Sequence, residues 1–467
     1  MSHFSFNRFL IFQLIVLSGI CLLSVSPQYL SAGELKIVPF NADVTPELGV
    51  PVAYAPARKI VTPLYARGIV LLSDEQPVVL CAVDAIGIGN AGYDIWRQEL
   101  AKAAKTTAER VALHSLHQHD APRFDFATGK LMEEQGLAGK NYDNDYNREC
   151  IQKVVDAITE GMKTPQTVTH LGIGKSKVEK VASNRRLLGG DGKVRLMRWS
   201  KSTSPEAIKA PEGVIDPYLR SICFWNQDHP IAVLNYYATH PQSYYGQGDV
   251  NYEFVGMARE ARNKALPGTL NVYFNGAAGN VAAGKYNDGS TKMRPILAGR
   301  VERAMQQAFD HQKKTEVTSA DLHWKTKMTA LPVASHLDSE KLAATIKDKT
   351  KTPKERASAA FRLVWYQRAS AGHQIPVTCL HLESASILHL PGELFVEYQL
   401  KAQEFAPERT VCMAAYGDYG PGYICTEIAY SQGGYESSPG ASLVAPEVES
   451  VLMQVIQNLV TSAPAKP

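Results

Sequence analysis

The sequence has little cysteine and little net charge, and each shortage excludes a class of protein. Its seven cysteines among 467 residues are scattered and form no Cys-x-x-Cys pair, so we expect neither a disulfide scaffold nor a thiolate zinc site. Cys412 and Cys425 could pair in an oxidising compartment. A net charge of +3, without a basic stripe interleaved with aromatic residues, argues against nucleic-acid binding. An apolar fraction of 45% and a charged fraction of 20% are typical of a folded, soluble protein.

Two common hydrolase motifs are also absent. No Gly-x-Ser-x-Gly occurs, which argues against a serine nucleophile on a sharp strand-to-helix turn. No His-Glu-x-x-His occurs either, so the common zinc-protease helix is missing.

Residues 279–285 match the phosphate-binding pattern Gly-x-x-x-x-Gly-Lys only in part. Tyr286 stands where a Ser or Thr should hold magnesium, and a turn-like segment follows where a helix should begin. Nucleotide binding is therefore a minor alternative. We interpret the segment as a glycine loop that brings backbone N–H groups to a ligand, with Gly279 and Asn280 as substrate-binding candidates.

The N-terminal segment has the composition of a secretory signal peptide. Arg8 is the only charge in residues 1–32, and the apolar run 10–25 is shorter than the ~20 residues that a membrane span needs. Small residues follow the run, so we expect cleavage near Ser26 or Ala32 and a secreted or periplasmic protein. An uncleaved membrane anchor is the alternative. No later stretch is apolar enough to span a bilayer, and residues 463–467 are expected to be a flexible end.

Strand-like and helix-like patterns alternate from residue 33 to residue 462. This alternation predicts an α/β fold, with mixed β-sheets flanked by helices in a single large domain. The expected strands are 68–72, 77–84, 111–114, 222–226, 231–238, 270–274, 378–384, 386–390 and 411–416. The expected helices are 94–110, 147–164, 252–264, 296–313, one beginning near Glu393, and 446–461. Residues from about 339 to 371 are charged and helical, which predicts a helical insertion on the surface.

Chemically active side chains follow several of these expected strands. His117 and His119 lie two residues apart after one strand, so in an extended backbone both would face the same side. His240 ends a second strand, Glu393 follows a third, and a tyrosine-rich loop over 416–435 follows a fourth. Taken alone, each of these residues would more often have a structural role than bind a metal. Because ligands gather beyond strand ends in α/β sheets, the group together favours a zinc site.

Ordered motifs across the mature chain resemble the neutral/alkaline non-lysosomal ceramidases, which are zinc-dependent amidases. The matching segments are Asn41–Pro46, Leu116–Pro122, Ser183–Arg186, Ala238–Ser243, Pro391–Glu393 and Tyr423–Glu436. The resemblance implies one zinc ion held by His117, His240, Glu393 and Tyr423. It also implies an active-site arginine at Arg185, His119 beside the substrate, and Tyr435 facing the scissile bond.

Three departures from the family pattern leave the substrate open. Ala282 stands where the family has a serine that is important for activity, and Asp120 replaces the serine after the second histidine. The sequence also ends soon after the tyrosine loop, where the family has a C-terminal immunoglobulin-like domain. Ceramide itself is therefore a doubtful substrate.

The resulting hypothesis is a zinc-dependent catalytic domain that hydrolyses an amide bond in a ceramide-like or other N-acyl amine. Zinc lowers the pKa of a bound water from 15.7 to roughly 7, which supplies a nucleophile at neutral pH. Arg185 and Tyr435 are candidates to stabilise the oxyanion, and His119 to pass a proton to the leaving amine. The alternatives are an esterase with the same site and a metal-containing binding protein without turnover. A small amphiphilic substrate would also bring peripheral membrane contact. The sequence does not give the oligomeric state.

Overall fold

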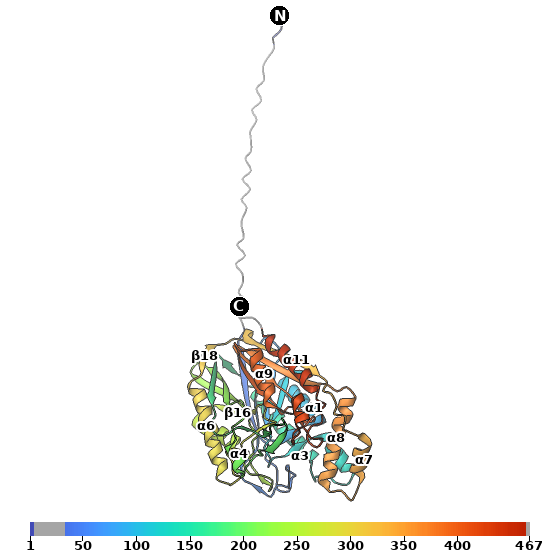
Figure 1. Cartoon of the computed structure of the whole chain (residues 1–467). Coiled ribbons are helices and arrows are strands. Elements are labelled where there is room, and N and C mark those ends of the chain that lie inside the picture. Colours follow the sequence, from blue (N-terminus) through green and yellow to red (C-terminus); the bar gives the residue numbers. More distant parts are fainter. Residues whose placement is uncertain (4–32, 464–467) are drawn as a thin grey trace. The chain divides into compact units, whose positions relative to one another are not determined.

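Three mixed β-sheets organise the chain from residue 33 onward (Figure 1). The structure is a computed structural model that describes residues 1–3 and 33–463. The expected signal peptide over residues 1–32 and the expected flexible end over residues 463–467 fall outside the described residues, apart from residues 1–3 and 463. Both assignments therefore stay predictions.

Each large sheet combines antiparallel strands with one parallel pair. The first sheet has the order β6 (Val111–Ser115), β4 (Val78–Val83), β3 (Tyr65–Leu72), β1 (Leu35–Asp43) and β8 (Gln166–Val168). The second has the order β16 (Leu270–Asn275), β14 (His229–Tyr237), β13 (Tyr218–Asn226), β9 (His170–Lys177) and β18 (Lys313–Glu316). The third has the order β19 (Leu322–Thr329), β20 (Ile375–Leu382), β21 (Ala385–His389) and β23 (Thr410–Ala414). The parallel pairs are β4–β6, β14–β16 and β21–β23.

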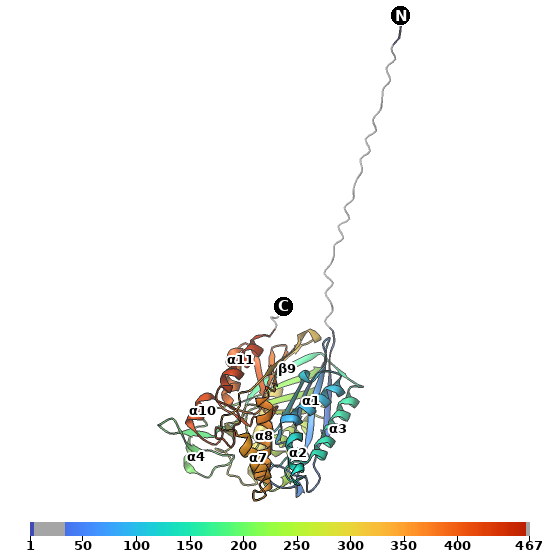
Figure 2. The same ribbon diagram turned by 90° about the vertical axis from the view of Figure 1, so that its right-hand side faces the viewer.

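Helices cover the outer faces of the sheets, as the alternating pattern predicts. The first sheet carries α1 (Asn90–Ala104) and α3 (Asn144–Gly161), which lie side by side in Figure 2. The second carries α5 (Glu253–Ala265) and α6 (Met293–Asp310), and the third carries α9 (Val396–Phe405) and α11 (Val448–Thr461). Within the described residues, no helix is long and apolar enough to cross a membrane.

Side chains of strand β1 alternate between the two faces of the sheet, and each face contributes to a different apolar cluster. Val38 and Phe40 point toward α1 and α3 and join the apolar cluster that those helices complete. Leu35 and Ile37 point the other way, into the larger cluster that also contains side chains of the second and third sheets. The first sheet is therefore buried on both faces.

The expected helical insertion over 339–371 consists of two helices, α7 (Ser339–Lys347) and α8 (Pro353–Ser370). Thr352 caps α8 in a reciprocal capping box with Glu355, and Pro353 occupies its first turn. Helix α8 packs against α2 (Phe126–Glu134). Two shorter helices, α4 (Pro205–Lys209) and α10 (Glu427–Gln432), lie in loops.

Five short two-stranded pairs in the described part of the chain connect loops that lie between the main strands. They are β5 (Gly87–Ile88) with β7 (Arg123–Phe124), β10 (Ser183–Asn184) with β17 (Val281–Ala282), β22 (Glu393–Leu394) with β24 (Tyr423–Ile424), β2 (Lys59–Ile60) with β15 (Asp249–Val250), and β11 (Arg186–Leu188) with β12 (Val194–Met197). The cysteines in the described residues are all buried and unpaired, so Cys412 and Cys425 form no disulfide.

One buried histidine joins the ends of strands from all three large sheets. His114 in β6 donates from Nδ1 to the Ala415 carbonyl, 2.5 Å away, and its Nε2 accepts from the Asn275 backbone N–H at 3.0 Å. Ala415 N–H in turn donates to the Asn275 carbonyl at 3.1 Å. The carboxyl ends of β6, β16 and β23 therefore meet, and the polar residues that follow them face one region.

Candidate metal site

His117 reaches this region by a turn and not by an extended strand. Strand β6 ends at Ser115, and His117 has φ +71°, in the left-handed region that non-glycine residues seldom adopt. The expectation that His117 and His119 project from one extended backbone is therefore wrong, although their rings still lie 4.7 Å apart. His117 Nδ1 lies 2.6 Å from the Ile86 carbonyl, so Nδ1 donates to this carbonyl and Nε2 is the ring nitrogen that faces Glu393.

His240 is held in the same way on the opposite side. It follows β14, and its backbone N–H donates to the Val281 carbonyl at 3.0 Å. Its Nδ1 lies 2.6 Å from the Ala278 carbonyl. A carbonyl can only accept, so Nδ1 again carries a proton, and Nε2 is the ring nitrogen that faces Glu393 and is left for a metal. Burial lowers the pKa of His240, which keeps the ring neutral.

Glu393 and Tyr423 are direct partners in the parallel pair of β22 and β24. The sequence predicts a helix that begins near Glu393, but α9 begins at Val396, and Glu393 lies in this two-residue strand. Gly392 turns the chain with φ +65°, and a Cβ there would lie 2.7 Å from the Gly422 carbonyl oxygen. Only glycine allows this close approach, and the approach places the carboxylate and the phenol beside each other.

These four residues present their ligand atoms to one point. Glu393 Oε2 lies 3.2 Å from His117 Nε2 and 3.0 Å from His240 Nε2, and Tyr423 Oη lies 3.4 Å from His240 Nε2. The two histidines and the glutamate are buried, and their ligand atoms all lie within 4.8 Å of one another. Ligand atoms around a tetrahedral zinc at ~2.0–2.1 Å would be about 3.3 Å apart. Two imidazoles and a carboxylate are ligand types that zinc accepts, so the donor set fits zinc.

The second carboxylate oxygen of Glu393 is also fixed. Tyr419 Oη donates to Glu393 Oε1 at 2.7 Å, which turns Oε2 toward the two imidazoles. Burial alone would raise the pKa of Glu393, but the imidazoles of His117 and His240 outweigh it and hold the pKa well below its usual range. The carboxyl group is therefore ionised, as a metal ligand must be.

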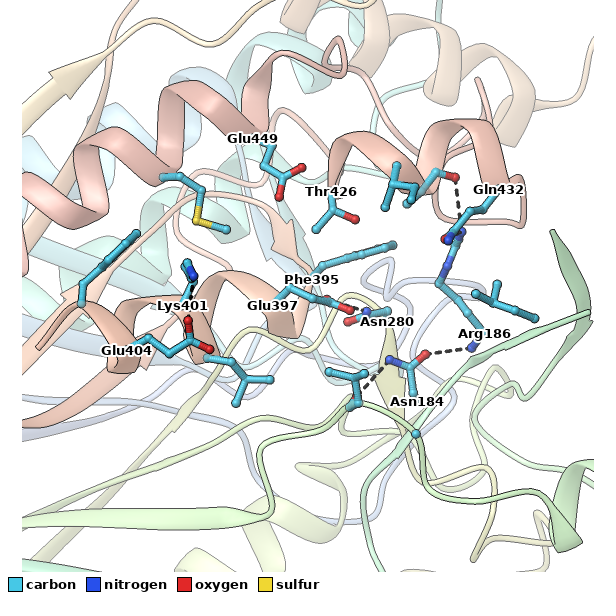
Figure 3. A pocket seen from close by; sticks show the side chains of 18 residues that line it. Asn184, Arg186, Asn280, Phe395, Glu397, Lys401, Glu404, Thr426, Gln432 and Glu449 are labelled. Atoms are coloured by element: carbon cyan, nitrogen blue, oxygen red, sulfur yellow. Dashed lines mark hydrogen bonds and ion pairs between the residues drawn. The ribbon is translucent and has the colours of Figure 1, made fainter. Parts of the chain in front are cut away.

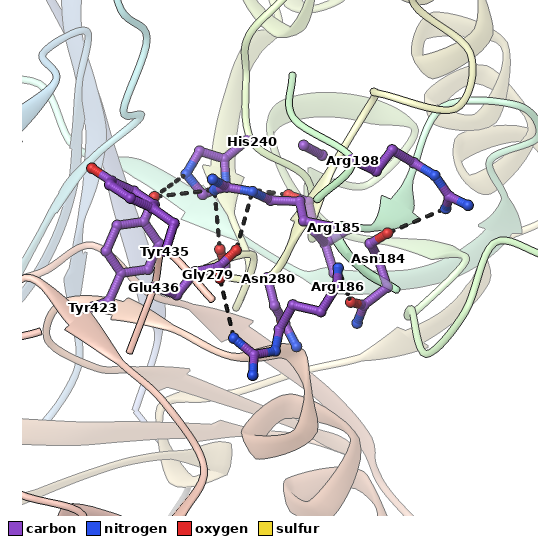
Figure 4. Close-up of polar contacts among 12 residues, drawn as sticks. Asn184, Arg185, Arg186, Arg198, His240, Gly279, Asn280, Tyr423, Tyr435 and Glu436 are labelled. Atoms are coloured by element: carbon purple, nitrogen blue, oxygen red, sulfur yellow. Dashed lines mark hydrogen bonds and ion pairs between the residues drawn. The ribbon is translucent and has the colours of Figure 1, made fainter. Parts of the chain in front are cut away.

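Arg185 connects the phenol ligand to a buried ion pair (Figure 4). Its Nη1 donates to Tyr423 Oη at 3.1 Å and to the Gly279 carbonyl at 3.4 Å. Its Nε lies 3.2 Å from Glu436 Oε1, while the other oxygen of Glu436 lies 3.2 Å from Arg186. Burial raises the pKa of Tyr423 and Arg185 opposes that effect. Arg185 therefore orients Tyr423, and its role toward an oxyanion stays a prediction.

His119 lies beside the ligand cluster with both ring nitrogens engaged. Its Nδ1 donates to the His117 carbonyl at 2.9 Å, and its Nε2 accepts from Gln242 Nε2 at 2.5 Å. Burial lowers the pKa of His119 well below its usual value, so the ring is neutral. To serve a leaving group, His119 must exchange its bond to Gln242 for one to the substrate.

Aromatic side chains form the open side of the cluster. Tyr54 stacks on His119 with ring centroids 5.7 Å apart, and Tyr435 lies 5.7 Å from the ring of Tyr423. Tyr54 is 44% exposed, Tyr435 45% and Trp199 47%, whereas the metal ligands are buried. These three exposed rings are therefore the residues around the cluster that reach solvent. This position suits the predicted role of Tyr435 near the scissile bond, which stays a prediction.

The residues of the glycine loop make mainly structural contacts with the segment that carries Glu393. Gly279 N–H donates to the Leu394 carbonyl at 2.6 Å, and a Cβ on Gly279 would lie 2.3 Å from the Glu393 carbonyl oxygen. The side chain of Asn280 donates to Glu397 at 2.8 Å and accepts from Val396 N–H at 2.9 Å. Both residues therefore brace the β22 segment that carries Glu393, and their predicted contact with substrate stays a prediction.

A separate cavity of about 650 Å³ lies on the other side of Asn280. Figure 3 shows Arg186, Asn280, Phe395 and Glu397 around it, with the ends of α9 and α11. None of the four candidate ligands lines this cavity.

Sequence reasoning missed several residues of the site. Tyr419 and Glu436 lie in or beside the tyrosine-rich loop, which was singled out without a role for either. Gln242 lies in a matched segment, two residues after a ligand. No sequence pattern indicated a role for Tyr54, because its position beside His119 depends on the packing of a loop that is distant in sequence.

Comparisons with known proteins bear on the fold. No protein-family model and no curated protein matches the chain. The solved structure of neutral ceramidase from Pseudomonas aeruginosa superposes with a TM-score of 0.68 at 17% identity, covering 93% of this chain and 75% of that chain. The structure of a ceramidase complexed with C2 superposes with a TM-score of 0.68 at 15% identity, covering 93% of this chain and 77% of that chain. The three-sheet architecture of this protein is therefore the fold of the neutral ceramidases.

Proposed function

We propose that this protein is a zinc-dependent hydrolase of linear amide bonds, with an N-acyl amine as its substrate. The observation that carries the proposal is the convergence of His117, His240 and Glu393 on one point, with their ligand atoms all within 4.8 Å of one another. The likeness to neutral ceramidases supports the reaction class. Export through the N-terminal segment is part of the same proposal.

The residues around the ligand cluster divide the tasks of amide hydrolysis. His117, His240, Glu393 and Tyr423 would hold a zinc ion, which would supply Lewis acidity to polarise the carbonyl and activate water. Tyr435, whose ring lies 5.7 Å from that of Tyr423, would donate a hydrogen bond to the oxygen on which charge develops. His119, once released from Gln242, would carry a proton to the departing nitrogen. Glu436 and Arg185 keep Tyr423 oriented.

The proposal is tested by metal analysis and by hydrolysis of a panel of N-acyl amines, with product detection by mass spectrometry. We expect about one zinc per chain and release of a free fatty acid. His240→Ala and Glu393→Ala should lose both metal and hydrolysis. Zinc binding without any product from the panel would instead favour a binding protein, consistent with Ala282 at the position of the family serine. Matched esters in the panel separate an esterase from an amidase.

A further inference from the structure

We infer that Arg123 binds a carboxylate on the amine side of the substrate, so that the preferred substrates are N-acyl amino acids and not neutral N-acyl amines. This inference rests on the proposed function, because it assigns the substrate class of the same site. It comes from a guanidinium group beside the ligand cluster that has no acidic partner.

The short strand pair β5–β7 places Arg123 next to the metal ligands. Arg123 pairs in register with Gly87, so its side chain leaves the ladder on the face where the Cβ of Gly87 would lie. That Cβ would meet the ring of Tyr419 at 2.7 Å. Tyr419 in turn donates to Glu393 Oε1. Arg123 is thus separated from a candidate metal ligand by one aromatic ring.

The loop that carries Tyr54 lies against the other side of Arg123. Ala53 N–H donates to the Ala121 carbonyl at 3.0 Å, and Val52 forms a bridge with Pro122, the residue before Arg123. Tyr54 stacks on His119, and the charge of Arg123 acts on Tyr54, so Arg123 and His119 are neighbours of the same ring. Arg185 and Trp199 instead lie beside Tyr435.

Arg123 is the exception among the enclosed arginines of the described chain. Arg259, Arg294 and Arg185 each have a carboxylate oxygen within 3.2 Å. Arg198 instead donates to four backbone carbonyls. Arg123 forms no ion pair with any described carboxylate, its Nε is buried without a hydrogen-bond partner, and its guanidinium lies 6.0 Å from the ring of Tyr142.

The groups around the Arg123 guanidinium are tyrosines, and the hydroxyl of Tyr142 is within hydrogen-bond reach of it. Neutral phenols compensate a half-buried charge less well than a carboxylate does. A cation against aromatic rings gains less than a charge-assisted hydrogen bond to a carboxylate, and a guanidinium can form two such bonds in parallel. Lys354 Nζ lies 5.4 Å from the ring of Tyr54, which adds a second positive charge at the same side of the opening. A purely structural arginine would be expected to have carbonyl or carboxylate acceptors, as Arg198 and Arg259 do.

The position beside His119 assigns the carboxylate to the amine side. In the proposed reaction, water oxygen bonds to the acyl carbon, the C–N bond breaks, and His119 passes a proton to the nitrogen. The products are a fatty acid and a free amino acid. A carboxylate one carbon from that nitrogen would lie on the His119 side of the scissile bond, where Arg123 is.

Three matched substrates test the inference on the zinc-loaded full-length protein. N-dodecanoylglycine carries the carboxylate on the amine side, N-dodecanoylglycinamide is its neutral counterpart, and the monomethylamide of dodecanedioic acid carries the carboxylate on the acyl side. We expect kcat/KM for N-dodecanoylglycine to exceed that for the neutral amide by about tenfold or more. Arg123→Gln should lower it by about tenfold to hundredfold and leave the neutral amide within about threefold.

Two further variants make the result specific. Arg123→Lys keeps the charge without the two-pronged geometry and should retain an intermediate preference. Arg148→Gln removes an exposed arginine that pairs with Asp145 and should change neither substrate.

The outcomes separate the two proposals. Equal hydrolysis of acid and neutral amide, unchanged in Arg123→Gln, would overturn the role of Arg123 and leave the amidase intact. Preference for the acyl-side carboxylate would overturn the assignment to the amine side. Hydrolysis of no amide by zinc-loaded wild-type protein would overturn the proposed function and this inference with it.

Discussion

Replacing Tyr419 by phenylalanine should weaken zinc binding without removing a ligand. The phenol of Tyr419 donates to Glu393 Oε1 at 2.7 Å and so keeps Oε2 turned toward the two imidazoles. A hydrogen bond to a charged group contributes about 1.5–3 kcal/mol, which corresponds to about tenfold to hundredfold in affinity. Loss of other hydrogen-bond partners of metal ligands costs about the same factor. We therefore expect the Kd for zinc to rise by about tenfold to hundredfold.

The measurement is a competition titration, in which metal-free protein and a chromophoric chelator of known affinity share a limiting amount of zinc at fixed pH. Tyr430→Phe is the matched control. It removes a tyrosine hydroxyl of the same loop that contacts Ser442 and no candidate ligand. A change below about threefold in Tyr419→Phe, or an equal change in Tyr430→Phe, would refute the reasoning that this hydrogen bond prepares the site.

Three other perturbations have directions that follow from the structure. Chelation of zinc should lower the unfolding temperature of the wild-type protein and leave His240→Ala unchanged in differential scanning calorimetry, because only an intact ligand set couples binding to folding. Glu436→Gln should lower the free energy of unfolding by about 3 kcal/mol in urea titrations, because two buried guanidinium groups lose their carboxylate; Glu206→Gln, in the exposed pair with Arg195, should have almost no effect. Burial raises the pKa of Asp418 to about 7, so its neutral form stabilises the fold fully below about pH 4 and this contribution is lost as the pH rises through 7. Asp418→Asn should therefore flatten the decline of unfolding free energy over that window, and parallel pH profiles for the two proteins would contradict this.

The sequence predicted strands best where burial on both faces leaves a continuous apolar run. Every residue of β4 is buried, and its expected range of 77–84 contains the observed strand. Strand β1 was missed because Pro39, Asn41 and Asp43 interrupt its pattern, although the antiparallel pairing with β3 accommodates all three. Strand β19, at the edge of the third sheet, was missed because the polar run Lys325–Lys327 leaves it without a continuous apolar stretch.

The candidate ligands were predicted because each follows a strand or a recognised motif, and strand ends converge in such folds. Their surroundings could not be predicted in the same way. The bond from Tyr419 to Glu393 joins residues 26 positions apart through the approach of two turns. The contact of Gln242 with His119 spans 123 positions and exists only in the folded chain. The helix expected to begin near Glu393 begins at Val396, since Gly392 first turns the backbone into a strand pair.

Because His114 joins the carboxyl ends of β6, β16 and β23, its replacement should affect the protein differently from replacement of His117 or His119. Alanine at His114, His117 or His119 should each abolish turnover, but for unrelated causes. Loss of His114 separates the strand ends and should depress cooperative unfolding as well as zinc content. Loss of His117 should empty the centre while the chain stays folded. Loss of His119 should leave a folded, zinc-loaded protein without turnover. Calorimetry and metal content together therefore distinguish the roles of three histidines whose replacement has the same effect on activity.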